Sequence, residues 1–129
     1  IYRAMHAAIG QELLRSSHTP TLGGLAVGFA LCTIGCCLGA DIDVSALPVD
    51  GAVDDDAKLF SESNSRFIVT CAPEKSAELE SVFAGLPLAR VGSVAEGQPL
   101  VIRNGPDRVL INADFQTLEN RFTKTLYDI

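Results

Sequence analysis

Tryptophan is absent from the 129 residues, and aromatic side chains make up only 6% of them. Hydrophobic residues nevertheless account for 47%, so the core must be built from Leu, Ile, Val and Ala. Charged residues contribute only 20%, which excludes an intrinsically disordered chain, because such chains are highly charged and weakly hydrophobic. The length predicts one compact domain.

Grouped basic residues are lacking as well. The ten Lys and Arg residues are scattered, the net charge is -6, and the densest charged run, Asp54–Asp56, is acidic. Proteins that bind nucleic acid need clustered positive charge to displace counterions from phosphates, so we expect no nucleic-acid partner.

No basic, apolar leader precedes the first helical pattern, and Ile1 is not an initiator Met, so we expect a fragment of a longer chain.

No charged residue occurs between Thr19 and Ala40, a stretch as long as a transmembrane helix. Pro20 and five glycines interrupt it, and no Lys or Arg flanks it. We therefore predict no membrane span, but a fully buried helix from Leu25 to about Cys36.

Spaced cysteine pairs of the kind that hold zinc are also missing. Three of the four cysteines, Cys32, Cys36 and Cys37, lie in the apolar stretch without a His or acidic neighbour, and Cys71 lies apart. We predict free and mostly buried thiols in a reducing compartment, and no metal site.

Periodic patterns predict an α+β sandwich with a mixed sheet. The first helix starts at Tyr2 and ends at Ser16–His18, and the acidic run at 54–56 begins a short helix through Phe60. The last helix, capped by Asn112 or Asp114, runs to Leu126. Between them we expect strands at 40–44, 66–72 and 88–94, a helix at 74–83, and a hairpin of strands at 99–103 and 108–111.

Several segments, read in order, resemble one family. They are the helix Tyr2–Ile9 followed by Ser16–His18 and Gly23–Val27, the strand entry Leu38–Val44, the string Leu59–Phe67 and the strand Ala89–Val94. The Leu-Phe-Ser-Glu-Ser part of the third segment is the most specific. On these residues the chain resembles the C-terminal domain of the AIR synthase-related superfamily, and within it the phosphoribosylformylglycinamidine synthases.

The resemblance implies a three-layer α/β/α sandwich, partly ferredoxin-like, formed as a single domain by residues 1–129. It implies a cytoplasmic ligase of purine biosynthesis that uses ATP, Mg²⁺ and glutamine-derived ammonia to turn an amide into an amidine. This fragment alone would hold no cofactor and would be inactive, since the preceding domain of the same chain binds the nucleotide. A glutaminase subunit or domain and a homo-oligomer are the further expected partners.

The resemblance assigns no catalytic or metal-binding residue here. It implies that the Gly23–Gly24 turn offers backbone N–H groups to a phosphorylated substrate, and that Glu62, Ser63 and Asn64 line the cleft. From the residues alone, Gly23–Gly24 is equally a plain turn, and Glu62 would form a surface ion pair with Arg66. His18 is a candidate proton carrier, although a loop histidine without a carboxylate beside it is the simpler interpretation.

Thr19–Leu22 stands where the family has Asp-x-Ser-Asp, so both carboxylates are missing. This loss favours an alternative in which the domain is a non-catalytic structural or dimerisation module. Pro20–Ala26 also resembles a string of the hydrogenase-maturation branch of the superfamily, but that branch lacks the Leu-Phe-Ser-Glu-Ser segment.

Overall fold

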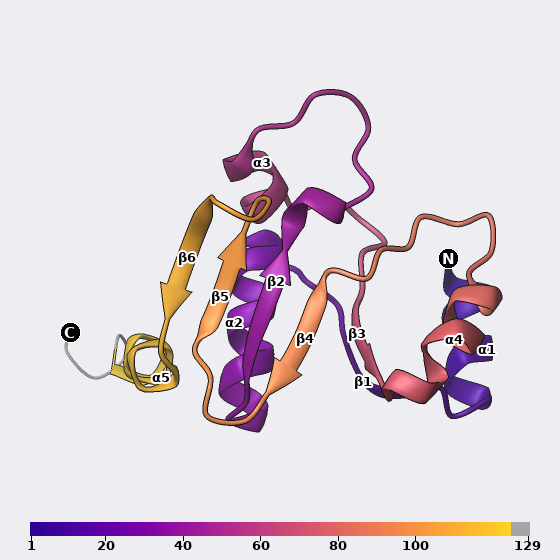
Figure 1. Cartoon of the computed structure of the whole chain (residues 1–129), viewed down its shortest axis with the longest axis horizontal. Helices are drawn as coiled ribbons and strands as arrows, with labels where there is room; N and C mark the ends of the chain where they lie inside the picture. The colour runs from indigo at the N-terminus through magenta and orange to yellow at the C-terminus, as the bar shows by residue number, and fades with distance from the viewer. Residues whose placement is uncertain (125–129) are drawn as a thin grey trace.

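A computed structural model describes residues 1–124, and its strands form two separate sheets (Figure 1). The helices are α1 (Tyr2–Gly10), α2 (Gly24–Cys36), α3 (Asp55–Phe60), α4 (Ser76–Val82) and α5 (Phe115–Lys124), with short 3₁₀ turns η1 (Val44–Ala46) and η2 (Pro73–Lys75). The strands are β1 (Leu14–His18), β2 (Gly39–Asp43), β3 (Ile68–Cys71), β4 (Gly92–Ala95), β5 (Leu100–Arg103) and β6 (Val109–Ala113). The predicted α+β class is confirmed.

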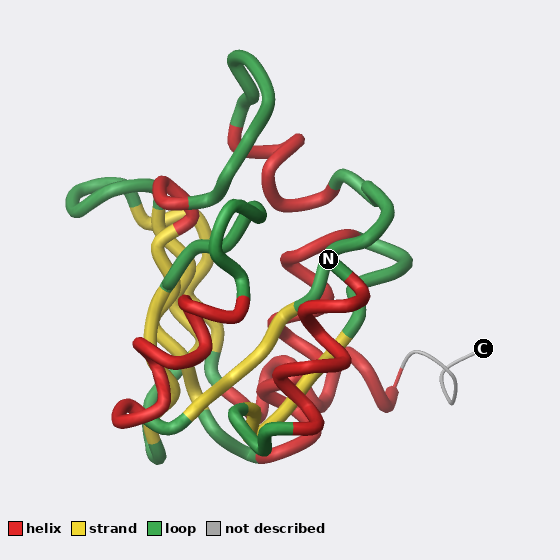
Figure 2. The backbone as a smooth tube through the Cα atoms, turned by 90° about the vertical axis from the view of Figure 1, so that its right-hand side faces the viewer, coloured by secondary structure: helices red, strands yellow, loops and turns green. Residues whose placement is uncertain are grey.

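The larger sheet has the strand order β4-β2-β5-β6, with β2 parallel to β5 and both other pairs antiparallel. It is therefore the mixed sheet that the patterns predict. Helix α2 lies behind this sheet in Figure 1, and its Phe29 packs with Ile42, Leu100 and Ile102 in the main core. Leu118 of α5 joins the same core, and α5 also contacts α2, so both helices contribute to the core of the larger sheet (Figure 2).

The smaller sheet is the antiparallel ribbon β1–β3, which lies between the larger sheet and the α1–α4 pair in Figure 1. Its core includes Met5 and Ala8 of α1, Leu13, Leu79 of α4 and Phe83 at the end of α4. The helices of the domain are thus shared between two sheets, each with its own hydrophobic cluster.

The predicted end of the first helix is wrong. Helix α1 ends at Gly10, Glu12 adopts a left-handed φ of 54°, and Ser16–His18 belong to strand β1 instead of a helix end. Pairing of His18 with Ile68 and of Ser16 with Thr70 along β3 stabilises the extended form. His18 is accordingly the last residue of a strand and not a loop histidine.

Helix α2 confirms the predicted helix within one residue at its start, but it is not buried along its whole length. Leu25 and Phe29 are 6% exposed, whereas Gly35 and Cys36 at its C-terminal end are exposed. All four cysteines are free, but Cys36 and Cys37 are exposed, so the prediction of mostly buried thiols is wrong for them. The apolar composition of the stretch gave no sign that its last residues would be exposed.

No helix within residues 1–124 is long and apolar enough to cross a membrane.

The predicted cap of the last helix, α5, is confirmed, because Asp114 accepts a hydrogen bond from the Thr117 backbone N–H at 2.7 Å. Leu126, expected in the last helix, lies outside the described residues.

Helix α3 connects the two parts of the domain and carries the chain into the candidate site. Asp54 caps it by accepting a hydrogen bond from the Ala57 backbone N–H at 2.8 Å. Asp55 forms an ion pair with Arg108 at 2.6 Å and also accepts a hydrogen bond from Asn104, which fastens α3 to the β5–β6 turn. The residues that follow α3 are therefore held next to the start of α2.

Candidate functional site

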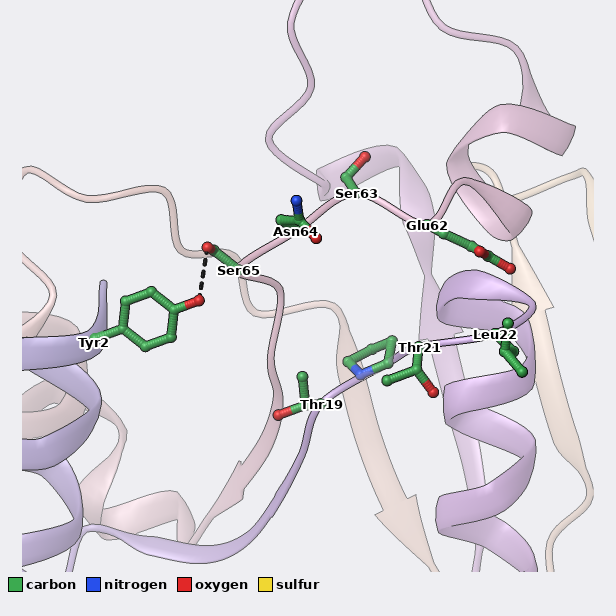
Figure 3. Close-up of a pocket in the computed structure, with 9 residues that line it drawn as sticks. Tyr2, Thr19, Thr21, Leu22, Glu62, Ser63, Asn64 and Ser65 are labelled. Atoms are coloured by element: carbon green, nitrogen blue, oxygen red, sulfur yellow. Dashed lines mark hydrogen bonds between the residues drawn. The ribbon is translucent and has the colours of Figure 1, made fainter.

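A pocket of about 570 Å³ opens where the segment before α2 faces the segment after α3 (Figure 3). Its lining comes from three places in the sequence: the start of α1, residues 19–22 and residues 62–65. The lining residues are Tyr2, Thr19, Pro20, Thr21, Leu22, Glu62, Ser63, Asn64 and Ser65. The volume is that of a small-molecule site.

Glu62 joins the two facing segments directly. Its Oε1 accepts a hydrogen bond from the Gly23 backbone N–H at 2.8 Å, across 39 positions of sequence. Gly23 is the N-cap of α2, where the helix dipole places partial positive charge, so the carboxylate lies where an anion is stabilised. The expected ion pair of Glu62 with Arg66 is not among the ion pairs of residues 1–124.

Gly24 allows the two backbones to approach closely. Its φ is +65°, and a Cβ atom built there would lie 2.7 Å from both the Leu59 and Ser61 carbonyl oxygens. Gly23 also has a left-handed φ, of +77°. The glycine pair is required by this contact as well as by the turn, and it brings the predicted residues Gly23, Gly24, Glu62, Ser63 and Asn64 to one place.

The Gly23–Gly24 turn does not offer the free N–H groups that the sequence led us to expect. The Gly23 N–H is donated to Glu62, and the Gly24 N–H is donated to the Thr21 carbonyl at 3.3 Å. The physical reason is that Glu62 is long enough to cross the gap and cap α2 from outside its own segment.

Arg66 and Tyr2 fix the shape of the segment that follows Glu62. The Arg66 guanidinium donates hydrogen bonds to the carbonyl oxygens of Ser61 and, at 3.3 Å, of Ser63. Partial burial lowers the pKa of this guanidinium. The Tyr2 hydroxyl lies 2.9 Å from the Ser65 hydroxyl, and its ring meets Phe67 edge-on with centroids 5.7 Å apart.

The chemistry of the pocket is polar but almost uncharged. Among its lining residues, all of them within the described part of the chain, Glu62 is the one ionisable acid, and there is no Lys, Arg or His. His18 does not line the pocket either. Within residues 1–124 no group of three or more His, Cys, Asp or Glu side chains is arranged to hold a metal ion.

Tyr2, Thr19, Thr21 and Ser65 were not predicted as site residues. The helical pattern assigns Tyr2 to an apolar face, which is correct for its ring but conceals its hydroxyl. Thr19 stood out only as the replacement of a family carboxylate, and Thr21 only as the residue at the family's serine position. The available signal was that Thr19, Thr21 and Ser65 carry hydroxyls close in sequence to predicted site residues, and it becomes informative only once the two segments are known to face each other.

The family described as "AIR synthase related protein, C-terminal domain" matches residues 1–103. Among curated proteins, the phosphoribosylformylglycinamidine synthase subunit PurL of Synechococcus sp. (strain WH7803) is 36% identical over 121 residues. That alignment covers 90% of this chain and 15% of the relative. The corresponding subunit of Thermococcus sibiricus is 28% identical over 121 residues, covering 94% of this chain and 16% of that protein.

Solved structures share the fold. T. maritima PurL complexed with ATP superposes with a TM-score of 0.80 at 18% identity, covering 91% of this chain and 20% of that chain. The same protein complexed with FGAR gives a TM-score of 0.80 at 17% identity, with the same coverage of both chains. The chain thus spans about a fifth or less of the proteins that it matches.

Proposed function

The chain belongs to the family of AIR synthase-related C-terminal domains, and on that premise we propose that it is the C-terminal domain of an ATP-dependent phosphoribosylformylglycinamidine synthase. In this proposal residues 1–129 form one domain of a longer cytoplasmic enzyme that converts an amide into an amidine in purine biosynthesis. The synthase names of the relatives support it over the hydrogenase-maturation branch.

The domain contributes one wall of the substrate cleft. The observation that carries this role is the contact between Glu62 and Gly23 at 2.8 Å, which makes two segments far apart in sequence the two sides of one pocket. Leu22 is 80% exposed, so its side chain does not pack into the gap as part of the core. The wall comprises the Gly23–Gly24 turn with Glu62, Ser63 and Asn64. The catalytic groups lie outside residues 1–129.

ATP and Mg²⁺ are proposed for the intact enzyme and are placed on the preceding domain of the same chain. The structure of T. maritima PurL complexed with ATP supports ATP as a ligand of the intact enzyme. The structure of PurLQS from Thermotoga maritima supports a glutaminase partner. Ile9, Val94 and Phe122 are large apolar residues 57%, 45% and 59% exposed, and they support contacts with other domains or a second copy.

Turnover by the intact protein tests the proposal. With the ribonucleotide amide, ATP, Mg²⁺ and ammonium as the nitrogen source, we expect ADP formation that depends on the amide. The chain expressed by itself should release no ADP above a heat-treated control, because it contains no phosphate-binding glycine-rich string. An intact protein that makes no amidine under these conditions would refute the synthase assignment.

The second candidate function is a structural module whose site has decayed. It is favoured by the missing carboxylates, because Thr19–Leu22 supplies hydroxyl, proline and apolar groups instead. An exchange of Asn64 for Ala separates the two roles. A scaffold would leave the KM for the amide substrate unchanged, whereas a cleft wall would raise it while the melting temperature stays the same.

A further inference from the structure

The pocket contains a set of neutral hydrogen-bonding groups and no cation. Five hydroxyls and one carboxamide line it, contributed by Tyr2, Thr19, Thr21, Ser63, Asn64 and Ser65. Sites that hold a phosphate normally supply Arg or Lys, or free backbone N–H groups at a helix start. The lining residues of this pocket, all described, include neither kind of side chain.

The backbone N–H groups of the Gly23–Gly24 turn are already donated within the protein, that of Gly24 to the Thr21 carbonyl oxygen at 3.3 Å. Glu62 accepts the Gly23 N–H at 2.8 Å, so the positive end of α2 already faces a carboxylate of the protein. A phosphate arriving at this turn would have to displace Glu62 or lie beside its negative charge. Two like charges a few ångströms apart repel each other, and α2 can stabilise only one of them.

Arg66 does not compensate for this charge. Its guanidinium donates to the carbonyl oxygens of Ser61 and Ser63, and it is not one of the residues that line the pocket. Its role is to hold the segment between Glu62 and Ser65 in shape. The pocket is therefore built for hydrogen bonding with uncharged groups.

We infer that this pocket binds the neutral, hydroxyl- and amide-bearing part of the substrate, and that the phosphate is held by another surface of the enzyme. This inference rests on the proposed function and specifies which part of that substrate the wall recognises. It adds Tyr2 and Ser65 to the binding residues. In Figure 3 Tyr2 and Ser65 point toward each other beside Asn64, opposite Thr19.

The Tyr2–Ser65 pair is suited to a sugar hydroxyl. The two hydroxyl oxygens lie 2.9 Å apart, so one donates to the other and a single hydrogen remains for a ligand. The pair therefore presents a donor and acceptor lone pairs, which match a hydroxyl that both donates and accepts. Asn64 adds an amide donor and an amide acceptor next to it.

The test compares two ligands that differ only in the phosphate: the ribonucleotide amide and its dephosphorylated nucleoside. Dissociation constants are measured by calorimetry, with competition for the weaker ligand, on the intact protein and on Asn64→Ala and Tyr2→Phe. Loss of one hydrogen bond should weaken binding about three- to tenfold, by the same factor for both ligands. Ser81→Ala, which removes an exposed hydroxyl on α4, is the matched control and should change neither constant.

Each remaining outcome decides against the inference. Weaker binding confined to the ribonucleotide would show that the pocket holds the phosphate, while leaving the synthase assignment intact. Unchanged binding of both ligands in both variants, with unchanged melting temperatures, would show that the pocket makes no substrate contact. If the wild-type protein bound neither ligand, the proposed function would fail together with the inference.

Inorganic phosphate gives a second, independent readout. Glu62→Ala removes both the charge that faces α2 and the oxygen that accepts the Gly23 N–H. We expect wild-type protein to show no phosphate-dependent change at this turn, and the Ala variant to gain phosphate binding. Equal phosphate binding by both proteins would contradict the role given to Glu62.

Discussion

Gly24→Ala tests the close approach of the two segments that form the pocket. Any residue with a Cβ is disfavoured at a φ of +65°, by about 1–2 kcal/mol. The new Cβ would in addition lie 2.7 Å from the Leu59 and Ser61 carbonyl oxygens, which are backbone atoms and cannot rotate away. Forcing such a contact costs about 1–3 kcal/mol more, so the total destabilisation should be about 2–5 kcal/mol.

Gly85→Ala is the matched control, because Gly85 has a similar φ of +78° but no atom within 4 Å of its added Cβ. It should lose only the conformational part, about 1–2 kcal/mol. Urea unfolding of both variants, followed by circular dichroism, measures the difference. Equal midpoints for the two variants would refute the close contact, whereas a lower midpoint for Gly24→Ala with an unchanged m-value supports it.

Three further predictions concern other parts of the domain. Asp54→Ala removes the cap of α3 and should lower the free energy of unfolding by about 0.5–2 kcal/mol in the same urea experiment; no change would contradict the cap. Hydrogen bonds, chiefly from the Gly105 backbone N–H and then from Ser45, hold the pKa of Asp43 below its usual value. The resulting stability should be present above the ordinary Asp pKa, about 3.9, and be lost as pH falls through the lower folded value. In Asp43→Asn the free energy of unfolding should fall less steeply as the pH is lowered than in the wild-type protein. An unaltered dependence on pH would contradict the role given to Asp43. In a thiol titration of the native protein, two thiols should react quickly because Cys36 and Cys37 are exposed, and two slowly, since burial raises the pKa of Cys32; four slow thiols would contradict the structure.

Local signals predicted those elements whose stability is mainly local. The acidic run before Phe60 gave the capped helix α3, and the turn residues at 104–107 gave the β5–β6 hairpin. The apolar stretch gave α2 because its length and composition fit a core helix. Strand β1 was missed because Leu14–His18 directly follow the helical apolar spacing that ends at Leu13, and their one apolar residue gives no strand alternation. Only pairing with β3, which lies 50 to 57 positions further along the chain, makes them extended.

The site was predictable only in part, and mainly through the family resemblance. That resemblance selected the Gly23–Gly24 turn and Glu62, which the structure brings into contact. It did not indicate that Glu62 would take the Gly23 N–H, because the reach of one side chain across a gap depends on the packing of α2 and α3. The contribution of Tyr2 was also hidden, since its hydroxyl meets Ser65 only after two distant segments have packed together.

Hydrogen exchange in the intact protein, with and without the ribonucleotide amide, tests most directly whether this domain forms a wall of the substrate cleft. Substrate should slow exchange in both residues 19–24 and residues 61–66, because the bound ligand would fill the pocket between them. Exchange in α4, on the far side of the ribbon, should stay the same. Slowed exchange in neither segment, at a substrate concentration that saturates the protein, would contradict the account and leave the domain as a scaffold.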